Sequence, residues 1–374
     1  MTEIERFENS NIFEKRKQDH VRIALDSRVQ FELGTGLNRV DLIHEALPNF
    51  NFSEISLRRN LWGQQFEAPF FISSMTAGHP QSLAINTTLA KAAADKGWLM
   101  GVGSQRRELR DPRAVAEWTQ IRKKFPQVRL AGNLGLAQII ITPVAQIQEL
   151  VDGLQAVALF IHLNPLQECL QPEGTPQFRG GAEALARLVD GLSVPVIVKE
   201  VGCGFSQATL QRLDNMGLYA VDISGKGGTH WGRIEGYRSQ EGSPLFEAAQ
   251  TFKDWGVSTT ESLINAQEAL KKTKSWASGG VRSGLDAGKL IAMGAEMVGL
   301  AKPFLEAAVQ DVQQDVQAGS SLATDSRSAD SIFTGSLLTE KMSLLEHELK
   351  IAMFCTGCKD LQELATKRVW KWQT

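Results

Sequence analysis

Residues 194–224 of the chain read VPVIVKEVGCGFSQATLQRLDNMGLYAVDIS. The runs at each end, Val194–Glu200 and Leu218–Ser224, are mostly apolar, which is typical of parallel strands covered on both faces. Between them, Gln207–Met216 has the spacing of apolar residues expected of a helix. A strand, a helix and a second strand in about 30 residues predict one βαβ unit with a parallel crossover.

The same alternation extends on both sides of this unit. Further short apolar runs that end at glycine or a polar residue predict strands at Phe70–Ser74, Trp98–Val102, Arg129–Asn133, Val157–Asn164, Trp276–Gly279 and Met297–Leu300. Helical patterns lie between most of them, for example at Ser82–Lys96 and Gly284–Met293. Eight strands alternating with helices predict an α/β fold of the (β/α)8 TIM-barrel type, and a doubly wound sheet is the alternative. Gly256–Thr259 competes as a strand and is interpreted as a loop before a helix at Ser262–Lys272.

The chain is expected to have three parts: an N-terminal segment packed on the barrel (1–69), the barrel itself (70–309), and a surface excursion followed by C-terminal helices (310–374). Glu14–Leu25 has a helical pattern, and Phe50–Leu61 is predicted to be extended. Gln310–Ser331 is rich in Ser, Gln and Asp, which is typical of a surface excursion. Leu337–Phe354 has the periodicity and the residue types of a helix.

Composition narrows the range of functions. The 374 residues include 40 Lys and Arg against 42 Asp and Glu, so the basic excess of a nucleic-acid surface is lacking. No apolar run reaches the roughly 18 residues of a membrane-spanning helix, and the start resembles no signal peptide. Cys355 and Cys358 form one CxxC without a second pair, which favours a structural reading over a zinc site. A cytoplasmic location is expected.

In a barrel the functional residues lie at the carboxyl ends of the strands. The first strand is followed by mostly small residues, Ser73–Gly78, that would let a ligand approach the backbone. The other seven ends carry polar or glycine-rich segments: Gly103–Arg106, Asn133, His162–Glu168, Lys199–Glu200, Ser224–His230, Ser278–Arg282 and Gly299–Pro303. The turns at Gly279–Gly280 and Gly299–Lys302 follow the last two strands, where barrels most often bind phosphate. Lys199 would place a cation in the barrel mouth, where it could stabilise a reduced flavin. The alternative is an ion pair with Glu200 or another carboxylate.

The fourth strand end combines several ligand types. His162 and Asn164 share a face of the strand, and Pro165 ends its pairing. Glu168, a single carboxylate, would suffice for Mg²⁺ if a substrate diphosphate supplied further oxygens. Near the start, Arg16 and Lys17 are either a solvated helix face or, with Arg106, a clamp for a multiply charged anion.

These strings together resemble the flavin-dependent, type 2 isopentenyl-diphosphate isomerase family. The resemblance runs from about residue 14 to about residue 365 and rests on Arg16-Lys17 before His20, Ser74-Met75-Thr76, Gly103–Arg106, Asn133–Gly135, His162-x-Asn164-x-x-Gln167-Glu168, Lys199–Gly202, Ser224-Gly225-x-Gly227-Gly228-Thr229, Gly279–Arg282 and Ala301–Pro303. Ala77 stands where the family usually has glycine. The Cys355 and Cys358 pair is not part of the pattern.

The resemblance implies an FMN-binding barrel, Mg²⁺, NADPH or another reductant, and interconversion of isopentenyl and dimethylallyl diphosphate by a homo-oligomer, a tetramer or octamer. It implies FMN contacts from Ser74, Met75, Thr76, Ser104, Asn133, Lys199, Ser224, Thr229, Gly279, Gly280, Val281, Ala301 and Lys302. It implies substrate contacts from Arg16, Lys17, Ser104, Gln105, Arg106, His162, Asn164 and Gln167. Glu168 is the implied Mg²⁺ ligand.

The reaction moves a double bond by one carbon, without net oxidation. Reduced FMN is expected to act as the acid and base and to stabilise cationic character on the alkene, with Gln167 and His162 as the catalytic side chains. One alternative is a flavin-dependent hydroxyacid oxidase, for which His230 and Arg282 would supply the base and the carboxylate ligand. A purine-nucleotide dehydrogenase would need a cysteine between Gly225 and Gly242, where none occurs. A flavin-binding regulatory module is a third alternative.

Overall fold

The central feature of the protein is a closed barrel of parallel strands. A computed structural model describes residues 10–31, 34–79, 81–109, 111–317 and 335–373. Eight strands pair in the order β10-β9-β8-β7-β6-β5-β4-β11. Their bounds are β4 (Phe70–Ile72), β5 (Leu99–Gly101), β6 (Arg129–Gly135), β7 (Ala158–Leu163), β8 (Val196–Glu200), β9 (Ala220–Asp222), β10 (Lys274–Trp276) and β11 (Val298–Leu300).

Hydrogen bonds between the first and last strands of this order close the barrel. The Ala277 N–H donates to the Met297 carbonyl at 2.9 Å, and the Gly299 N–H donates to the Ala277 carbonyl at 2.8 Å. A doubly wound sheet would have two open edges, so the predicted (β/α)8 barrel is confirmed and its alternative is wrong.

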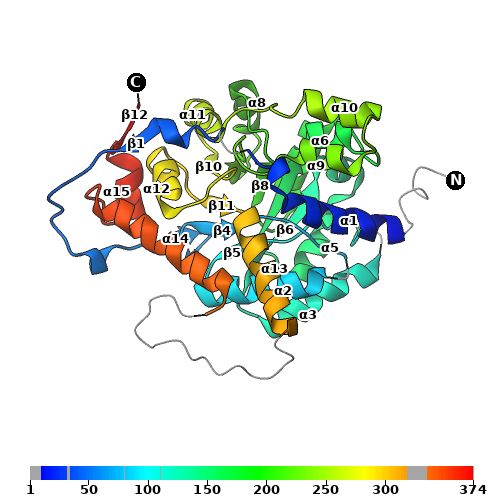
Figure 1. The fold of residues 1–374 in the computed structure, drawn as a ribbon, viewed down its shortest axis with the longest axis horizontal. Helices are drawn as coiled ribbons and strands as arrows, with labels where there is room; N and C mark the ends of the chain where they lie inside the picture. Colours follow the sequence, from blue (N-terminus) through cyan, green and yellow to red (C-terminus); the bar gives the residue numbers. More distant parts are fainter. Residues whose placement is uncertain (1–9, 32–33, 80, 110, 318–334, 374) are drawn as a thin grey trace.

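Helices form the outer layer around the strands (Figure 1). In chain order they are α2 (Ser82–Lys96), α3 (Ala116–Lys124), α4 (Leu136–Ile141), α5 (Val144–Leu154), α6 (Pro165–Leu170), α7 (Gly181–Gly191), α8 (Gln207–Leu213), α9 (Trp231–Arg238), α10 (Pro244–Thr251), α11 (Thr259–Ala269), α12 (Gly284–Ala292) and α13 (Lys302–Gln317). Helix α11 begins three residues before the predicted Ser262 because the Ser258 side chain caps it by accepting from the Glu261 N–H.

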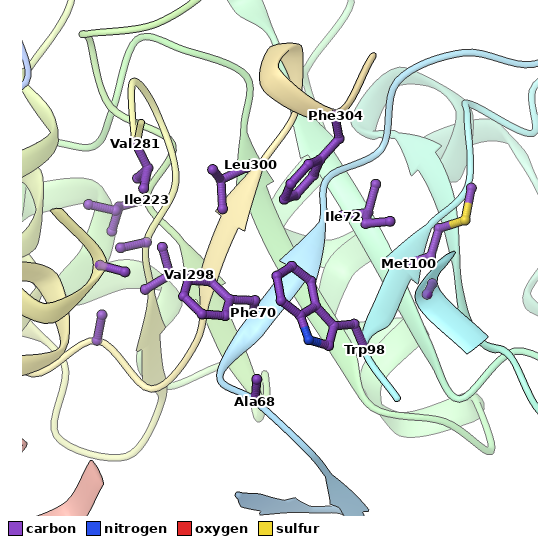
Figure 2. Close-up of a cluster of buried hydrophobic side chains, with 14 of the residues drawn as sticks. Ala68, Phe70, Ile72, Trp98, Met100, Ile223, Val281, Val298, Leu300 and Phe304 are labelled. Carbon is purple, nitrogen blue, oxygen red and sulfur yellow. The ribbon is translucent and has the colours of Figure 1, made fainter. Parts of the chain in front are cut away.

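The apolar core has two layers, one on each side of the strands. Between strands and helices, Phe70 stacks on Trp98 with ring centroids 4.8 Å apart, and Trp98 meets Phe304 of α13 edge-on (Figure 2). Inside the barrel a second cluster includes Phe71, Phe160, Ile197, Ala220 and Trp276. Burial on both faces explains the continuous apolar runs in the sequence.

A hairpin closes the amino-terminal end of the barrel. Strands β2 (Arg59–Leu61) and β3 (Gln64–Phe66) are joined by Trp62 and Gly63, both with positive φ, at 53° and 72°. The Trp62 ring packs on Tyr219 and Trp276. The sequence predicted an extended run at Phe50–Leu61. This prediction is wrong over the first part of the run, because Phe52–Glu54 forms a 3₁₀ turn held by a capping box between Asn51 and Glu54.

The chain ends pack on the outside of the barrel. Helix α1 (Ser10–Ala24) contacts α9, and α14 (Leu337–Phe354) contacts α12 and α13. Strand β1 (Val40–Leu42) pairs antiparallel with β12 (Trp370–Trp372), and α15 (Leu361–Thr366) contacts α12.

The region predicted as a surface excursion begins inside a helix. Helix α13 continues through Gln317. Within it, Asp311 is buried, and its carboxylate accepts from the N–H groups of Leu337 and Leu338 at the start of α14. Residues 318–334 of that predicted excursion lie outside the described part of the chain. The division into three parts stays a prediction. Across the described ranges, no helix combines the length and the apolar character that crossing a membrane requires.

Candidate active site

A cavity of about 730 Å³ lies at the carboxyl ends of the strands. Alternation along the strands explains its polar lining. Phe160 and Ile197 belong to the barrel interior, so His162 and Lys199, two residues further along, point the same way above that apolar layer. Of the residues predicted for the site, all but Thr76 and Gln105 line this cavity.

Thr76 and Gln105 lie in the wall behind the cavity. The Thr76 carbonyl accepts from the Asn86 side-chain amide at 3.0 Å. The Gln105 side-chain oxygen accepts from the Asn133 N–H at 3.1 Å, and its nitrogen donates to Glu108 at 2.7 Å. Gln105 thereby braces the β6 end. The predicted ligand contacts of both residues stay predictions.

One end of the cavity has the backbone geometry of a phosphate site. Gly280 has φ of +78°, and a Cβ atom there would lie 2.2 Å from the Gly227 carbonyl oxygen, so only glycine fits. Helix α13 begins at Lys302, directly after β11, and has no acidic residue in its first turn. Its N-terminus therefore presents partial positive charge to the cavity. Both turns predicted to bind phosphate line this end.

The floor of the cavity holds a buried ion pair. The Lys199 ammonium donates to the Asp222 carboxylate at 2.6 Å and to the Ser278 hydroxyl at 3.1 Å. Lys199 thus forms an ion pair with Asp222, as the alternative expected, and it also lines the cavity, so its contact with a flavin stays a prediction. Glu200 points elsewhere, because its carboxylate accepts from the N–H groups of the loop at Val201–Cys203. Burial raises the pKa of Glu200 to about 7.

Three cations also line the cavity. Arg16 and Lys17 come from α1, and Arg106 follows β5. Arg16 is 9% exposed, which is inconsistent with a solvated helix face. Burial, with the charges of Arg16 and Arg106, lowers the pKa of Lys17 to about 7. Arg16 is buried and Lys17 and Arg106 are half-buried, so three positive charges line the cavity together, which suits a multiply charged anion.

His162 faces this cationic region as a neutral ring. The Asn133 side-chain nitrogen donates to the Val102 carbonyl at 3.2 Å, so its oxygen faces His162 Nδ1 at 2.9 Å. Nδ1 is therefore assigned the proton, and Nε2 is an acceptor. Burial and the charges of Lys17, Lys199 and Arg106 lower the pKa of His162 to about 3.

Helix α6 positions the predicted metal ligand. The Asn164 side-chain amide donates to Gln167 and to Glu168, both at 3.0 Å. The other Glu168 oxygen accepts from the Thr175 N–H. Pro165 at the first helical position lets the helix start directly at the strand end. In the described ranges, no group of three or more His, Cys, Asp or Glu residues could hold a metal ion.

Sequence reasoning missed Glu235, which lies behind Gln167. Its carboxylate is fully buried, lies 2.9 Å from His20 Nε2, and accepts from Gln167 Nε2 at 2.9 Å and from Arg238. Burial alone would raise the pKa of Glu235, but His20 and Arg238 lower it to about 2. His20 lies one helical turn after Arg16, so its spacing was a usable signal. Nothing in the α9 sequence singles out Glu235.

The residues required by the oxidase alternative do not form its site. His230 is fully buried, and its Nδ1 accepts from the Arg233 N–H at 3.0 Å as the cap of α9. The Arg282 guanidinium donates to the carbonyls of Gly280 at 2.9 Å and Phe31 at 2.7 Å. His230 is therefore not placed as a catalytic base, and Arg282 is not placed to bind the carboxylate of a substrate.

Known proteins resemble the chain at two levels. The family model of FMN-dependent dehydrogenases matches residues 167–325. The barrel is similar to a mandelate oxidase with an FMN adduct (TM-score 0.56, 15% identity, covering 97% of this chain and 96% of that chain). It is also similar to flavocytochrome b2 (TM-score 0.63, 16% identity, covering 98% and 87%). At these identities the likeness shows the fold alone.

Other proteins are much more similar to this chain in sequence. An isopentenyl-diphosphate delta-isomerase of Bdellovibrio bacteriovorus is 50% identical over 366 residues, covering 97% of this chain and 99% of the relative. Proteins of the same name from Legionella pneumophila and a Synechococcus species are 49% and 41% identical, covering 95% and 92% of this chain and 97% and 93% of the relatives. The chain therefore belongs to the isopentenyl-diphosphate delta-isomerase family, as its motifs predicted.

Proposed function

We propose that the protein is an FMN-dependent isomerase that interconverts isopentenyl diphosphate and dimethylallyl diphosphate in isoprenoid biosynthesis. One observation carries the proposal: a single cavity is lined both by the glycine turns after β10 and β11 and by Arg16, Lys17, Arg106 and Glu168. A cavity with two sets of anion-binding groups suits a phosphorylated cofactor and a diphosphate substrate together. The volume of about 730 Å³ lies within the range of roughly 300–1,000 Å³ usual for such sites.

The residues present fit FMN. Gly280 and the start of α13 would hold its phosphate, and Lys199 would face its electron-rich ring. The hydroxyls of Ser73 and Ser74, which line the cavity, are buried without a hydrogen-bond partner among the described residues. Such groups normally have a partner, and a bound cofactor would supply one. When bound and reduced, FMN would supply an electron-rich ring and an exchangeable proton.

The protein side chains would hold and orient the substrate. Arg16, Lys17 and Arg106 would bind the diphosphate, and Glu168 would bind Mg²⁺ together with diphosphate oxygens. The alkene gains a proton at its terminal carbon and loses one from the carbon next to C1, so atoms and charge balance. Gln167, fixed between Asn164 and Glu235, would orient the alkene end of the substrate or relay one of these two protons.

Other features of the assembly complete the proposal. We infer that NADPH or another reductant keeps FMN reduced, and that the protein works as a homo-oligomer, a tetramer or octamer, in the cytoplasm. The four cysteines, Cys169, Cys203, Cys355 and Cys358, are free thiols, which suits a reducing compartment.

Anaerobic incubation of the protein with FMN, dithionite, Mg²⁺ and isopentenyl diphosphate tests the reaction. The dimethylallyl isomer should form only when FMN is reduced. Equal turnover with oxidised FMN would contradict the role of reduced flavin. Oxidation of a 2-hydroxy acid without isomerisation would favour the oxidase alternative.

The substrate KM should depend on the protonation of Lys17. Because its pKa is lowered to about 7, Lys17 is protonated below that pH and loses its charge above it. The KM for isopentenyl diphosphate is therefore expected to rise from about pH 7 to about pH 9, by up to about tenfold for each unit. Lys17→Arg, which keeps its charge, should flatten this rise. A KM profile that Lys17→Arg leaves unchanged would assign the pH dependence to another group.

A further inference from the structure

Asp222 is a buried carboxylate that the proposed reaction does not use. It is fully buried at the end of β9 and lies directly across from Lys199 in the strand register. The Lys199 ammonium donates to Asp222 Oδ2 at 2.6 Å. The Ser278 hydroxyl, just after β10, lies 2.8 Å from Oδ1 and 3.0 Å from Oδ2 of the same carboxylate. Lys199 and Ser278 line the cavity, whereas Asp222 lies behind them.

Burying a carboxylate is costly unless its partners are held in place. All three residues stand at inward-facing positions of neighbouring strands, two residues beyond Ile197, Ala220 and Trp276 of the interior cluster. The barrel backbone thus fixes the geometry. The result is an ammonium at the cavity floor with a compensating negative charge immediately behind it.

We propose that Asp222, with Ser278, is a positioning residue that fixes the Lys199 ammonium and sets the net charge that the cavity floor presents to the flavin. This inference rests on the proposed function, because it assumes FMN in the cavity. A cation near the flavin ring stabilises the reduced, more electron-rich form. The carboxylate weakens that effect, since at short range opposite charges partly cancel. Asp222 therefore tunes how strongly the protein favours reduced over oxidised FMN.

Asp222→Asn tests the charge with almost no change in shape. Asparagine keeps an oxygen that can accept from Lys199 but leaves the ammonium uncompensated. We expect the ratio of Kd for oxidised FMN to Kd for reduced FMN to rise by about tenfold or more. For a two-electron couple, tenfold corresponds to a rise of about 30 mV in the potential of bound FMN. Anaerobic titration of the holoenzyme with dithionite and a reference dye measures it.

Lys199→Met with and without Asp222→Asn shows whether Asp222 acts through Lys199. In a double-mutant cycle, Asp222→Asn should shift the potential much less when Lys199 is already replaced. Asp214→Asn is the matched control. Asp214 is also buried, at 6% exposure, but it accepts from the N–H groups of Lys271, Lys272 and Thr273 away from the cavity. Asp214→Asn should lower Tm and leave the potential of bound FMN unchanged.

A potential unchanged in Asp222→Asn, with only Tm lowered, would show that Asp222 is merely structural and would overturn the inference. An equal shift with and without Lys199 would overturn the positioning role. If the asparagine variant does not fold, Asp222→Ser removes the same charge and should shift the potential in the same direction. Failure of the unmodified protein to bind FMN would instead overturn the proposed function, and this inference with it.

Discussion

Glu168→Gln is expected to lower kcat by roughly a hundredfold to a thousandfold while FMN binding stays near normal. Glu168 is the carboxylate that α6 presents beside the cationic cluster, and its orientation is fixed by Asn164 and Thr175. A metal that neutralises diphosphate charge supplies several kcal/mol, and each 1.4 kcal/mol is about tenfold in rate. Glutamine keeps the shape and the bond from Asn164 but is a far weaker Mg²⁺ ligand.

Turnover at increasing Mg²⁺ concentration, with FMN fluorescence quenching measured in parallel, checks this expectation. Glu168→Asp is the matched variant, because it keeps the charge and should regain activity at higher Mg²⁺. Loss of FMN binding in Glu168→Gln would place this carboxylate at the flavin instead. Full activity in that variant would remove Glu168 from the metal site.

Replacing both Arg16 and Lys17 with alanine is expected to raise the substrate KM by roughly a hundredfold or more. A charge-assisted hydrogen bond contributes about 1.5–3 kcal/mol, and 1.4 kcal/mol is tenfold in affinity. Both residues line the cavity from α1. Because the lost interactions bind the diphosphate, FMN affinity should change little.

Lys15→Ala is the matched control for this pair. Lys15 neighbours Arg16 on the same helix, but its side chain is exposed and does not line the cavity. Steady-state kinetics at low and high salt separate a specific site from general attraction. A KM unchanged by the double replacement would show that Arg16 and Lys17 do not bind the substrate and belong to a solvated helix face.

The barrel could be predicted because a strand buried on both faces leaves a clear apolar run. Ends of elements were harder to predict. Trp276–Gly279 was predicted as a strand, but β10 is Lys274–Trp276, because Lys274 and Ser275 pair with β9 although their side chains are polar. The Phe50–Leu61 prediction failed where Asn51 and Glu54 cap a local turn. Such local hydrogen bonds compete with extended structure and leave little periodic signal.

Residues of the candidate site could be predicted where they lie at or just after the end of a strand. His162, Lys199 and Gly280 were found in this way. Glu235 was missed because it reaches the site from a helix whose facing direction depends on packing with α1. Asp222 had a usable signal: it is a charged residue in an apolar strand, two residues after Ala220, just as Lys199 follows Ile197. A charge in such a run requires a partner, and the neighbouring strand supplies it.

A crystal structure of the reduced protein with FMN, Mg²⁺ and isopentenyl diphosphate tests the account most directly. The account predicts the FMN phosphate at Gly280 and the start of α13, the diphosphate in contact with Arg16, Lys17 and Arg106, and Mg²⁺ about 2.1 Å from a Glu168 oxygen. A diphosphate bound outside this cavity, or a metal ion without Glu168 among its ligands, would contradict it.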